Sequence, residues 1–546
     1  MTRWWLVGAF AAVFACSAQP QEQPTFRATT NLVDFTIVAL DGNGNPITDL
    51  KQDEITVTDS GKSRDLAFFR FEGGAQKAAV PKTLPAGGFT NRSEYAPGPT
   101  RNIAAIVLDT LNTPAQDQMW VRAQVMRYLR VLAPETRVAV YSLGEQMAIL
   151  HDFTEDTGSL RERLARSGLG SQAQVTADID QMVRDAEALL EAIPPSKRAL
   201  TTEALTANLE TEMLYNARVR ERRVMSTLAS LEALGNHLAG IPGRKSMVWI
   251  SGGISILSIT SAVGIKSYEP LVRGTSERLA NQGITMYLVD KRGLYGRPGT
   301  SAETGRAPTS EIGRLGGGPF QRQQELARKS SDPLPAMMLM AEVTGGRVVM
   351  NTNDLSQGMK AAVADLRGSY SLGFYALGEP DGKWHKLNVR VKRRGVKLVH
   401  RQGYVSETPA AQSPDWPAEQ WNAAMYNPLG STALHLDARC ERAPGDGTLS
   451  VSLSIPAEDL HFRKVGDQLV ADLDIGIGEK TAAGVLGLWQ EKATAIGDPA
   501  GSVRYRKSWK VNPAASTIRL IVRDRLTGRF GTLEVAVRNI PAQPAN

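Results

Sequence analysis

The segment Asn102-Ile-Ala-Ala-Ile-Val-Leu-Asp109 is a continuous apolar run that ends at a carboxylate. A run of this kind, followed by apolar residues at helical spacing, is typical of a strand buried on both faces of a sheet. Comparable runs recur downstream, with helical stretches between them. The repetition predicts an α/β domain over residues 101–405, with a doubly wound, mostly parallel, Rossmann-type sheet. The later runs are 137–141, 247–250, 284–289 and 347–350.

The segments on either side of this domain alternate apolar and polar residues, as half-buried strands do. They predict an N-terminal β domain over residues 26–75 and a C-terminal β-sandwich domain over residues 430–546. Segments 76–100 and 406–429 are rich in Pro, Gly, Ala or polar residues and are expected to be linkers. Two insertions into the α/β domain are expected, a helix near 170–206 and a Gly- and Arg-rich surface loop at 291–330.

The N-terminus has the pattern of an export signal. Residues 1–18 contain a basic start, an apolar core and small residues before a polar stretch, which predicts a signal peptide cleaved after Ala18. The segment Val13-Phe-Ala-Cys16 also fits a lipoprotein signal, which would leave Cys16 lipidated. Both readings predict an exported protein, periplasmic or extracellular, with membrane attachment only if Cys16 carries a lipid. Cys440 is then the single thiol available for pairing, so no internal disulfide is expected.

Composition excludes several classes of protein. The 546 residues carry a net charge of +7 and contain two cysteines, which excludes a disulfide scaffold and a four-cysteine zinc site. The mild positive charge does not require nucleic acid, and no nucleic-acid partner is expected. The sequence contains no G-x-S-x-G, H-E-x-x-H, Walker A or C-x-x-C motif, and its six histidines are scattered. We therefore expect no enzyme activity.

Several segments in fixed order resemble one family. They are Asp109-Thr-Leu-Asn-Thr113, Gly243-Arg-Lys-Ser-Met-Val-Trp-Ile-Ser-Gly-Gly253, Thr344-Gly-Gly-Arg347 and Tyr370-Ser-Leu-Gly-Phe-Tyr375. Together they resemble the acidobacterial-type von Willebrand factor A-related family over roughly residues 26–405. The resemblance implies a sheet of von Willebrand factor A type and a divalent-ion adhesion site at the carboxyl ends of its strands, where Asp and hydroxyl oxygens hold Mg²⁺.

The ion-site pattern is incomplete in this chain. Asp109 and Thr113 match it, but Leu111 stands where a hydroxyl is expected, and Ser251-Gly252-Gly253 lacks the second carboxylate. The remaining threonine ligand has no firm candidate beyond Thr201 and Thr202. Two ligands would hold Mg²⁺ only weakly, so no cofactor is certain. The alternative is structural: Thr113-Pro114-Ala-Gln116 reads as a helix capping box, and Asp109 can cap backbone N–H groups.

These observations favour a non-catalytic protein-binding or adhesion module with a degenerate ion site, whose partner is a protein of the envelope or extracellular space. The alternatives are an adhesion protein with a working Mg²⁺ site and a secreted hydrolase with an unrecognised site. The arginines of segment 218–223 are expected on a solvated helix face, and loop 291–330 is the better candidate for contact with polyanions. The reading requires the strands that begin near Ile103 and Met247 to be parallel neighbours.

Overall fold

The chain is a mixed α/β protein in the computed structural model. The structure describes residues 31–73, 82–95, 103–132, 136–154, 156–166, 178–259, 265–291, 320–378, 381–406, 415–443, 447–465, 468–496 and 501–542. The predicted signal peptide, the lipidation site Cys16 and most of loop 291–330 lie outside these residues. Among the helices described, none combines the length with the apolar sequence that a membrane span needs.

The central sheet has six strands in the order β13-β12-β9-β6-β7-β8. Strands β6, β7, β9, β12 and β13 pair in parallel, and β8 joins the edge antiparallel to β7. Every residue of β6, β9 and β12 is buried. The strands are β6 (Ile103–Asp109), β7 (Val138–Leu143), β8 (Met147–Thr154), β9 (Lys245–Ser251), β12 (Ile284–Asp290) and β13 (Arg347–Val349).

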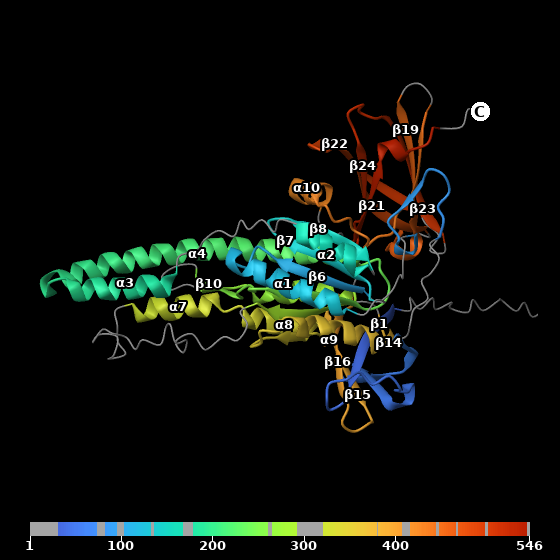
Figure 1. The fold of residues 1–546 in the computed structure, drawn as a ribbon. Helices are drawn as coiled ribbons and strands as arrows, with labels where there is room; N and C mark the ends of the chain where they lie inside the picture. Colours follow the sequence, from blue (N-terminus) through green and yellow to red (C-terminus); the bar gives the residue numbers. More distant parts are fainter. Residues whose placement is uncertain are drawn as a thin grey trace, which may run out of the picture.

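Helices pack on both faces of this sheet, and the alternation along β6 shows it. Ile103 and Val107 enter a core shared with Leu231, Leu279 and Met340 of helices α4, α5 and α8. Ala104, Ile106 and Leu108 enter a second core, formed with helices α1, α2 and α9. The continuous apolar runs thus correspond to strands with two covered faces (Figure 1). The helices are α1 (Ala115–Val131), α2 (Thr157–Arg166), α4 (Pro195–Leu238), α5 (Glu269–Asn281), α8 (Leu334–Thr344) and α9 (Ser356–Arg367).

The expected adjacency of the two decisive strands is confirmed. β6 and β9 run in parallel, with Ile103 opposite Lys245 and Leu108 opposite Ile250. Their carboxyl ends therefore meet at one edge of the sheet, which we call the carboxyl rim. Asp109 and Ser251 lie there together.

The N-terminal strands form two packed sheets with strands that follow the central sheet in sequence. One sheet has the order β16-β1-β14-β4 and the other β17-β15-β2-β3, and they enclose one core that includes Phe35, Tyr370 and Leu387. The domain boundaries expected from the sequence divide this pair of sheets, because they assign the strands of residues 369–405 to the α/β domain. The strands are β1 (Asn31–Leu40), β2 (Ile55–Asp59), β3 (Lys62–Arg64), β4 (Leu66–Phe71), β14 (Ser369–Ala376), β15 (Trp384–Val391), β16 (Lys397–His400) and β17 (Gly403–Val405).

The C-terminal strands also form two packed sheets around one core, in the orders β23-β19-β18-β5 and β20-β21-β24-β25, with β22 on β21. Cys440 lies in this core, and burial raises the pKa of its thiol to about 12. The strands are β18 (Asp437–Arg442), β19 (Thr448–Pro456), β20 (Arg463–Val465), β21 (Gln468–Thr481), β22 (Gly484–Ile496), β23 (Ser502–Lys510), β24 (Thr517–Asp524) and β25 (Phe530–Ala536).

Both expected linkers contain regular structure. β5 (Gly88–Thr90) pairs with β18, so a piece of segment 76–100 completes a C-terminal sheet. α10 (Ala418–Tyr426), within segment 406–429, packs Trp421 and Met425 against Ile521 of β24. The two segments have the composition of linkers, but contacts with the C-terminal domain give parts of them regular structure.

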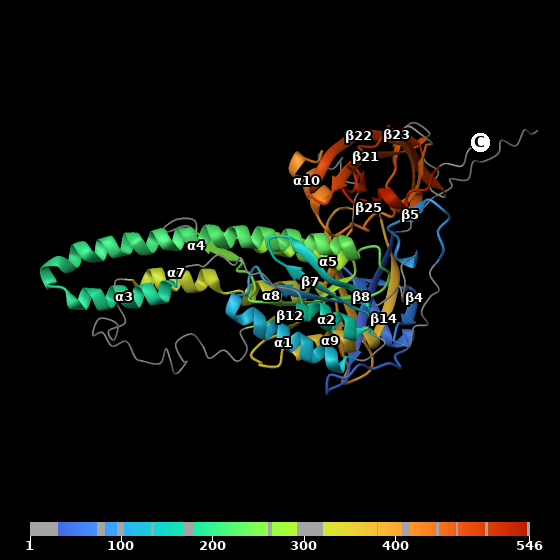
Figure 2. The same cartoon turned by 45° about the horizontal axis from the view of Figure 1, so that its top comes forward.

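Helix α4 is 44 residues long and projects far past the sheet, beside α3 (Ile179–Ala192) and α7 (Gln321–Ser331) (Figures 1 and 2). We call residues 179–226 together with α7 the arm. A core of its own, which includes Val183, Met213 and Phe320, holds the arm helices together. The expectation of a structureless loop over 291–330 is therefore wrong for 321–331, where a helix forms.

A pH-dependent contact supports the N-terminal sheets. The Nδ1 atom of His385 lies 3.1 Å from Asp59 Oδ1, and Nε2 lies 3.1 Å from Asp381 Oδ1. Burial lowers the pKa of His385, but the hydrogen bonds with Asp381 and Asp59 outweigh it, so the net shift is upward from 6.5. The stabilisation from the charged form is thus complete below the unfolded pKa, near 6.5, and is lost as pH rises through the folded value.

We therefore predict that the substitution His385→Gln lowers the melting temperature more at pH 5.5 than at pH 9. The expected difference between the two pH values is about 1–3 °C, the scale of a half-exposed ion pair. Thermal unfolding followed by circular dichroism measures it. Asp381→Asn, which removes one of the two carboxylates, should give part of the same pH dependence. An equal loss at both pH values would contradict the assignment.

Candidate functional site

Asp109, the first predicted site residue, ends β6 at the carboxyl rim and is 3% exposed. Its Oδ1 atom accepts hydrogen bonds from the backbone N–H groups of Leu111, at 3.0 Å, and Asn112, at 2.8 Å. The carboxylate thereby fixes the turn between β6 and α1, as expected for a capping residue.

The second carboxylate oxygen of Asp109 accepts three further hydrogen bonds. The donors are Asn112 Nδ2, at 2.8 Å, Trp249 Nε1, at 3.1 Å, and Ser251 Oγ. Asn112 Nδ2 also donates to Thr227 Oγ1 of α4, at 2.8 Å, which ties this helix to the rim. Five protein donors therefore surround the carboxylate.

Hydrogen-bond donors and an arginine of the protein interact with the carboxylate of Asp109. Burial raises the pKa of Asp109, and the hydrogen bonds from Ser251, Asn112 and Trp249 oppose that rise. Arg223 lies one helical turn before Thr227 on α4; burial lowers its pKa, and the charge of Asp109 opposes this. A guanidinium thus supplies positive charge near the carboxylate.

Thr113, the second predicted site residue, is 2% exposed but forms no capping box. Helix α1 begins at Ala115, with Pro114 as the N-cap residue and no side-chain cap. Because the helix starts one residue later than the capping box requires, Gln118 serves this turn. Its Nε2 donates to the carbonyl oxygens of Thr110, at 3.2 Å, and Thr113, at 2.9 Å. Thr113 Oγ1 has no hydrogen-bond partner within the described ranges.

The residues at the rim do not fit a divalent cation. Hydrogen-bond donors already fill the oxygens of Asp109, and the described chain holds no group of three His, Cys, Asp or Glu side chains placed for a metal. A Cβ atom at Gly252 would lie 2.4 Å from the carbonyl oxygen of Asn112, so no carboxylate side chain fits there. Thr201 and Thr202 lie on α4, about 37 Å along the helix from Thr227.

The arm begins where α4 leaves the rim. Since Thr227 contacts Asn112 just past the end of β6, residues 195–226 extend beyond it, for about 48 Å at 1.5 Å per residue. Large apolar side chains are exposed along it, with exposed fractions of 46% for Leu189, 75% for Leu200 and 53% for Tyr215. The arginines of segment 218–223 are expected on a solvent-exposed helix face, and this is only partly correct. Arg220 is half-buried, and burial lowers its pKa.

His151 and His237, the two histidines nearest the α/β sheet in sequence, contact hydroxyl, carbonyl and aromatic groups. His151 Nε2 lies 3.4 Å from Ser159 Oγ, but that hydroxyl donates to the carbonyl oxygen of Asp156, and Nδ1 of His151 meets a backbone carbonyl. His237 contacts the carbonyl oxygen of Gly430 and the edge of Tyr141. Both therefore serve as polar packing residues in the described structure.

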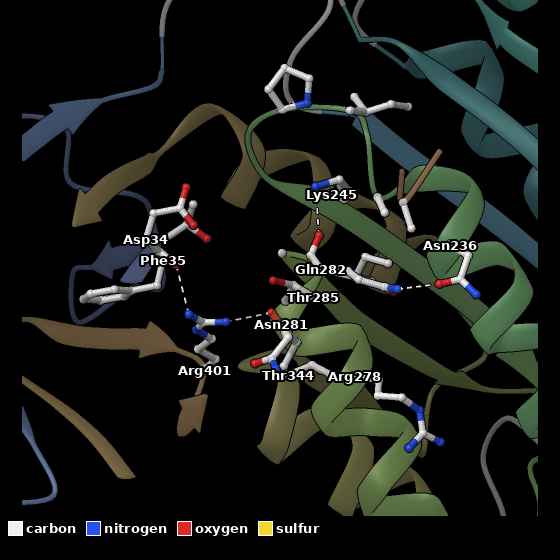
Figure 3. A pocket seen from close by; sticks show the side chains of 18 of the residues that line it. Asp34, Phe35, Asn236, Lys245, Arg278, Asn281, Gln282, Thr285, Thr344 and Arg401 are labelled. Atoms are coloured by element: carbon white, nitrogen blue, oxygen red, sulfur yellow. Dashed lines mark hydrogen bonds between the residues drawn. The ribbon is translucent and has the colours of Figure 1, made fainter. Parts of the chain in front are cut away.

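A second feature lies at the opposite, amino edge of the sheet. A cavity of about 610 Å³ opens between β1, the loop after α4, the end of α5 and the C-terminal loop 527–530 (Figure 3). Lys245, Gln282 and Arg401 line it. Sequence reasoning missed this site, because its residues come from segments more than 300 residues apart. The only signal was a lysine at the start of an otherwise apolar strand.

Comparison with solved structures finds weak similarities. BatB from Bacteroides thetaiotaomicron, described as a conserved hypothetical protein, is 10% identical over 49% of this chain and 98% of its own, with a TM-score of 0.21. An aerotolerance-related membrane protein from Bacteroides fragilis is 11% identical over 47% and 95%, with a TM-score of 0.20. A von Willebrand factor type A protein from Catenulispora acidiphila is 8% identical over 95% and 76%, with a TM-score of 0.16.

No family model matches the chain, and no curated protein matches it. TM-scores of 0.16 to 0.21 are too low to carry an argument, so the interpretation of the site rests on the geometry of this chain. The acidobacterial-type family assignment stays a prediction.

We predict that Asp109→Asn destabilises the protein by about 3 kcal/mol, because three donors then face an amide NH₂ group. Ser251→Ala, which removes one of these donors, should cost on the order of 1 kcal/mol. Urea unfolding of the full chain measures both values. Millimolar Mg²⁺ or Mn²⁺ should leave the melting temperature of the wild type unchanged. A rise that disappears in Asp109→Asn would instead restore the ion-dependent alternative.

Proposed function

We propose that this chain is an exported, non-catalytic protein-binding module of von Willebrand factor A type, flanked by two β-sandwich domains, and that it binds its partner without a metal ion. The observation that carries the proposal is the arm, which projects about 48 Å past the carboxyl rim. A long helix held out on its own small core presents a surface that the packing of the sheet does not need.

The exposed side chains of the arm support a protein partner. Leu200 and Tyr215 remain largely exposed although the arm has a buried core of its own, and tyrosine is one of the side chains enriched among the residues that dominate protein interfaces. The 44 residues of α4 connect this surface to the rim through Thr227 and to the start of β9, which follows it. A partner bound to the arm would therefore contact a helix that continues to the central sheet.

Metal independence follows from the state of Asp109. In an ion-dependent adhesion site the carboxylate would be open to the cation and to the partner. Here five donors enclose it, and Arg223 supplies the positive charge. We therefore place the partner surface on the arm and not on an ion in the crevice.

Export rests on the predicted signal in residues 1–18. In that setting the partner is a protein of the envelope or the extracellular space. Attachment to a membrane would require lipidation of Cys16.

We predict that Leu200→Glu weakens partner binding at least tenfold, while the melting temperature changes by less than about 2 °C, because this side chain is 75% exposed. Cross-linking the purified protein to the envelope fraction, with the partner identified by its peptides, provides the binding measurement.

The matched control is Leu377→Glu, at a leucine that is 76% exposed on the N-terminal sheets, away from the arm. It should bind as the wild type does. Equal binding by all three proteins would place the partner surface elsewhere and refute the proposal for the arm.

A non-catalytic module should turn over no member of a panel of ester, peptide and glycoside substrates. His151 is the test residue for the hydrolase alternative, since its Nε2 atom lies 3.4 Å from the hydroxyl of Ser159. Turnover above the buffer rate that is lost on His151→Gln would identify an enzyme and overturn this part of the proposal. Steady-state assays with the wild type and this variant decide the question.

A further inference from the structure

The cavity at the amino edge is enclosed by three parts of the fold. Asp34 to Thr36 come from β1 of the N-terminal sheets, residues 239–245 and 278–285 come from the α/β domain, and residues 527–530 come from the C-terminal domain. Its volume of about 610 Å³ is that of a site for a small molecule.

Lys245 is a buried cation in this cavity. Its side chain is 4% exposed, and its Nζ donates to the carbonyl oxygens of Gln282, at 2.9 Å, and Gly243, at 3.4 Å. Within the described chain it forms no ion pair. Burial lowers the pKa of Lys245 to about 8, with the charge of Asp34 opposing, so the amine is still mostly charged at pH 7.

Arg401 is a second cation on the wall. Its guanidinium donates to the carbonyl oxygens of Ala280 and Asp34, each at 2.9 Å. Its Nε atom is buried and has no hydrogen-bond partner among the residues described. Burial lowers the pKa of Arg401 to about 10. Figure 3 shows Arg401 and Lys245 on different sides of Gln282.

The charges that line the cavity do not balance. Arg529 joins Lys245 and Arg401 as a third cation, and it donates to the carbonyl oxygen of Ala433, at 2.7 Å. Against them stand the carboxylate of Asp34, the carbonyl groups at the end of α5, which act as about half a negative charge, and Asp459, whose pKa the charge of Arg529 helps to lower. Arg278 also lines the cavity, but Glu232 pairs with it. The excess is positive.

An unpaired acceptor is buried beside this cavity, next to Gly235 of α4. Gln282 donates through Nε2 to Asn236 Oδ1, at 2.8 Å, while its Oε1 atom is buried without a hydrogen-bond partner in the described structure. This oxygen and Arg401 Nε are both closed off from solvent, so the donors that face the cavity are the other nitrogens of its cations.

We propose that this cavity binds a small oxyanion, a phosphate or carboxylate compound, through Lys245, Arg401 and Arg529. The oxyanion accepts hydrogen bonds from these cations. Because the walls come from three parts of the fold, the bound anion joins the N-terminal sheets, the α/β domain and the C-terminal loop. This site lies at the edge of the sheet opposite the arm and goes beyond partner binding.

The experiment measures melting temperature and binding heat at pH 7 with sodium phosphate and with sodium citrate, against sodium chloride of equal ionic strength. We expect 10 mM of at least one anion to raise the melting temperature of the wild type by about 2 °C or more. The variants Lys245→Met and Arg529→Met should bind that anion at least about tenfold more weakly. A response to only one anion identifies the oxyanion group.

Lys266→Met is the matched control, since Lys266 is an exposed lysine paired with Glu221 away from the cavity. It should bind as the wild type does. Circular dichroism establishes that each variant is folded, and Arg529→Met carries the test if Lys245→Met does not fold. Absence of heat and of a shift with both anions in the wild type overturns the proposal. An equal response in Arg529→Met and the wild type overturns it as well.

Discussion

A carboxylate buried at the end of a fully buried strand is stable only when each of its oxygens is hydrogen-bonded, and Asp109 meets this condition with protein groups alone. Trp249 and Ser251 reach it from the neighbouring strand, and Asn112 links it to α4. The pairing of β6 with β9, the turn into α1 and the place where α4 crosses the rim all depend on this one group. The carboxylate oxygens that could bind a metal ion are thereby occupied by hydrogen bonds that stabilise the fold.

Local packing at the rim leaves no room for a second carboxylate where the family resemblance would place one. The backbone of Gly252 lies so close to Asn112 that a Cβ atom would stand 2.4 Å from a carbonyl oxygen. Leu111 turns an apolar side chain to the core formed with α4 and α8. Neither residue offers a side-chain oxygen, and the carboxylate of Asp109 is hydrogen-bonded without one.

The sequence predicted the features that depend on hydrophobic periodicity and on the direction of the chain. It did not predict the features that depend on pairing between segments far apart in the sequence. The continuous apolar run ending at Asp109 correctly predicted a doubly covered strand beside the one at Met247, because both properties follow from local pattern. Alternation at 369–405 could not reveal that these strands pair with 31–71, since an alternating strand accepts many partners. The cavity was out of reach for the same reason, as Asp34 and Arg401 meet only through such pairing.

The two edges of the central sheet differ in the sign and in the surroundings of their charged side chains. At the carboxyl rim, five hydrogen-bond donors enclose Asp109, and the buried Asp290 ends the neighbouring strand β12 beside Ser251. At the amino edge, three cations rest mainly on backbone carbonyl groups, which carry partial charges, and a volume of about 610 Å³ remains. Burial of unpaired charge costs several kcal/mol per ion. Because an anion would offset these charges, we propose the small-molecule site at the amino edge, where the cavity lies.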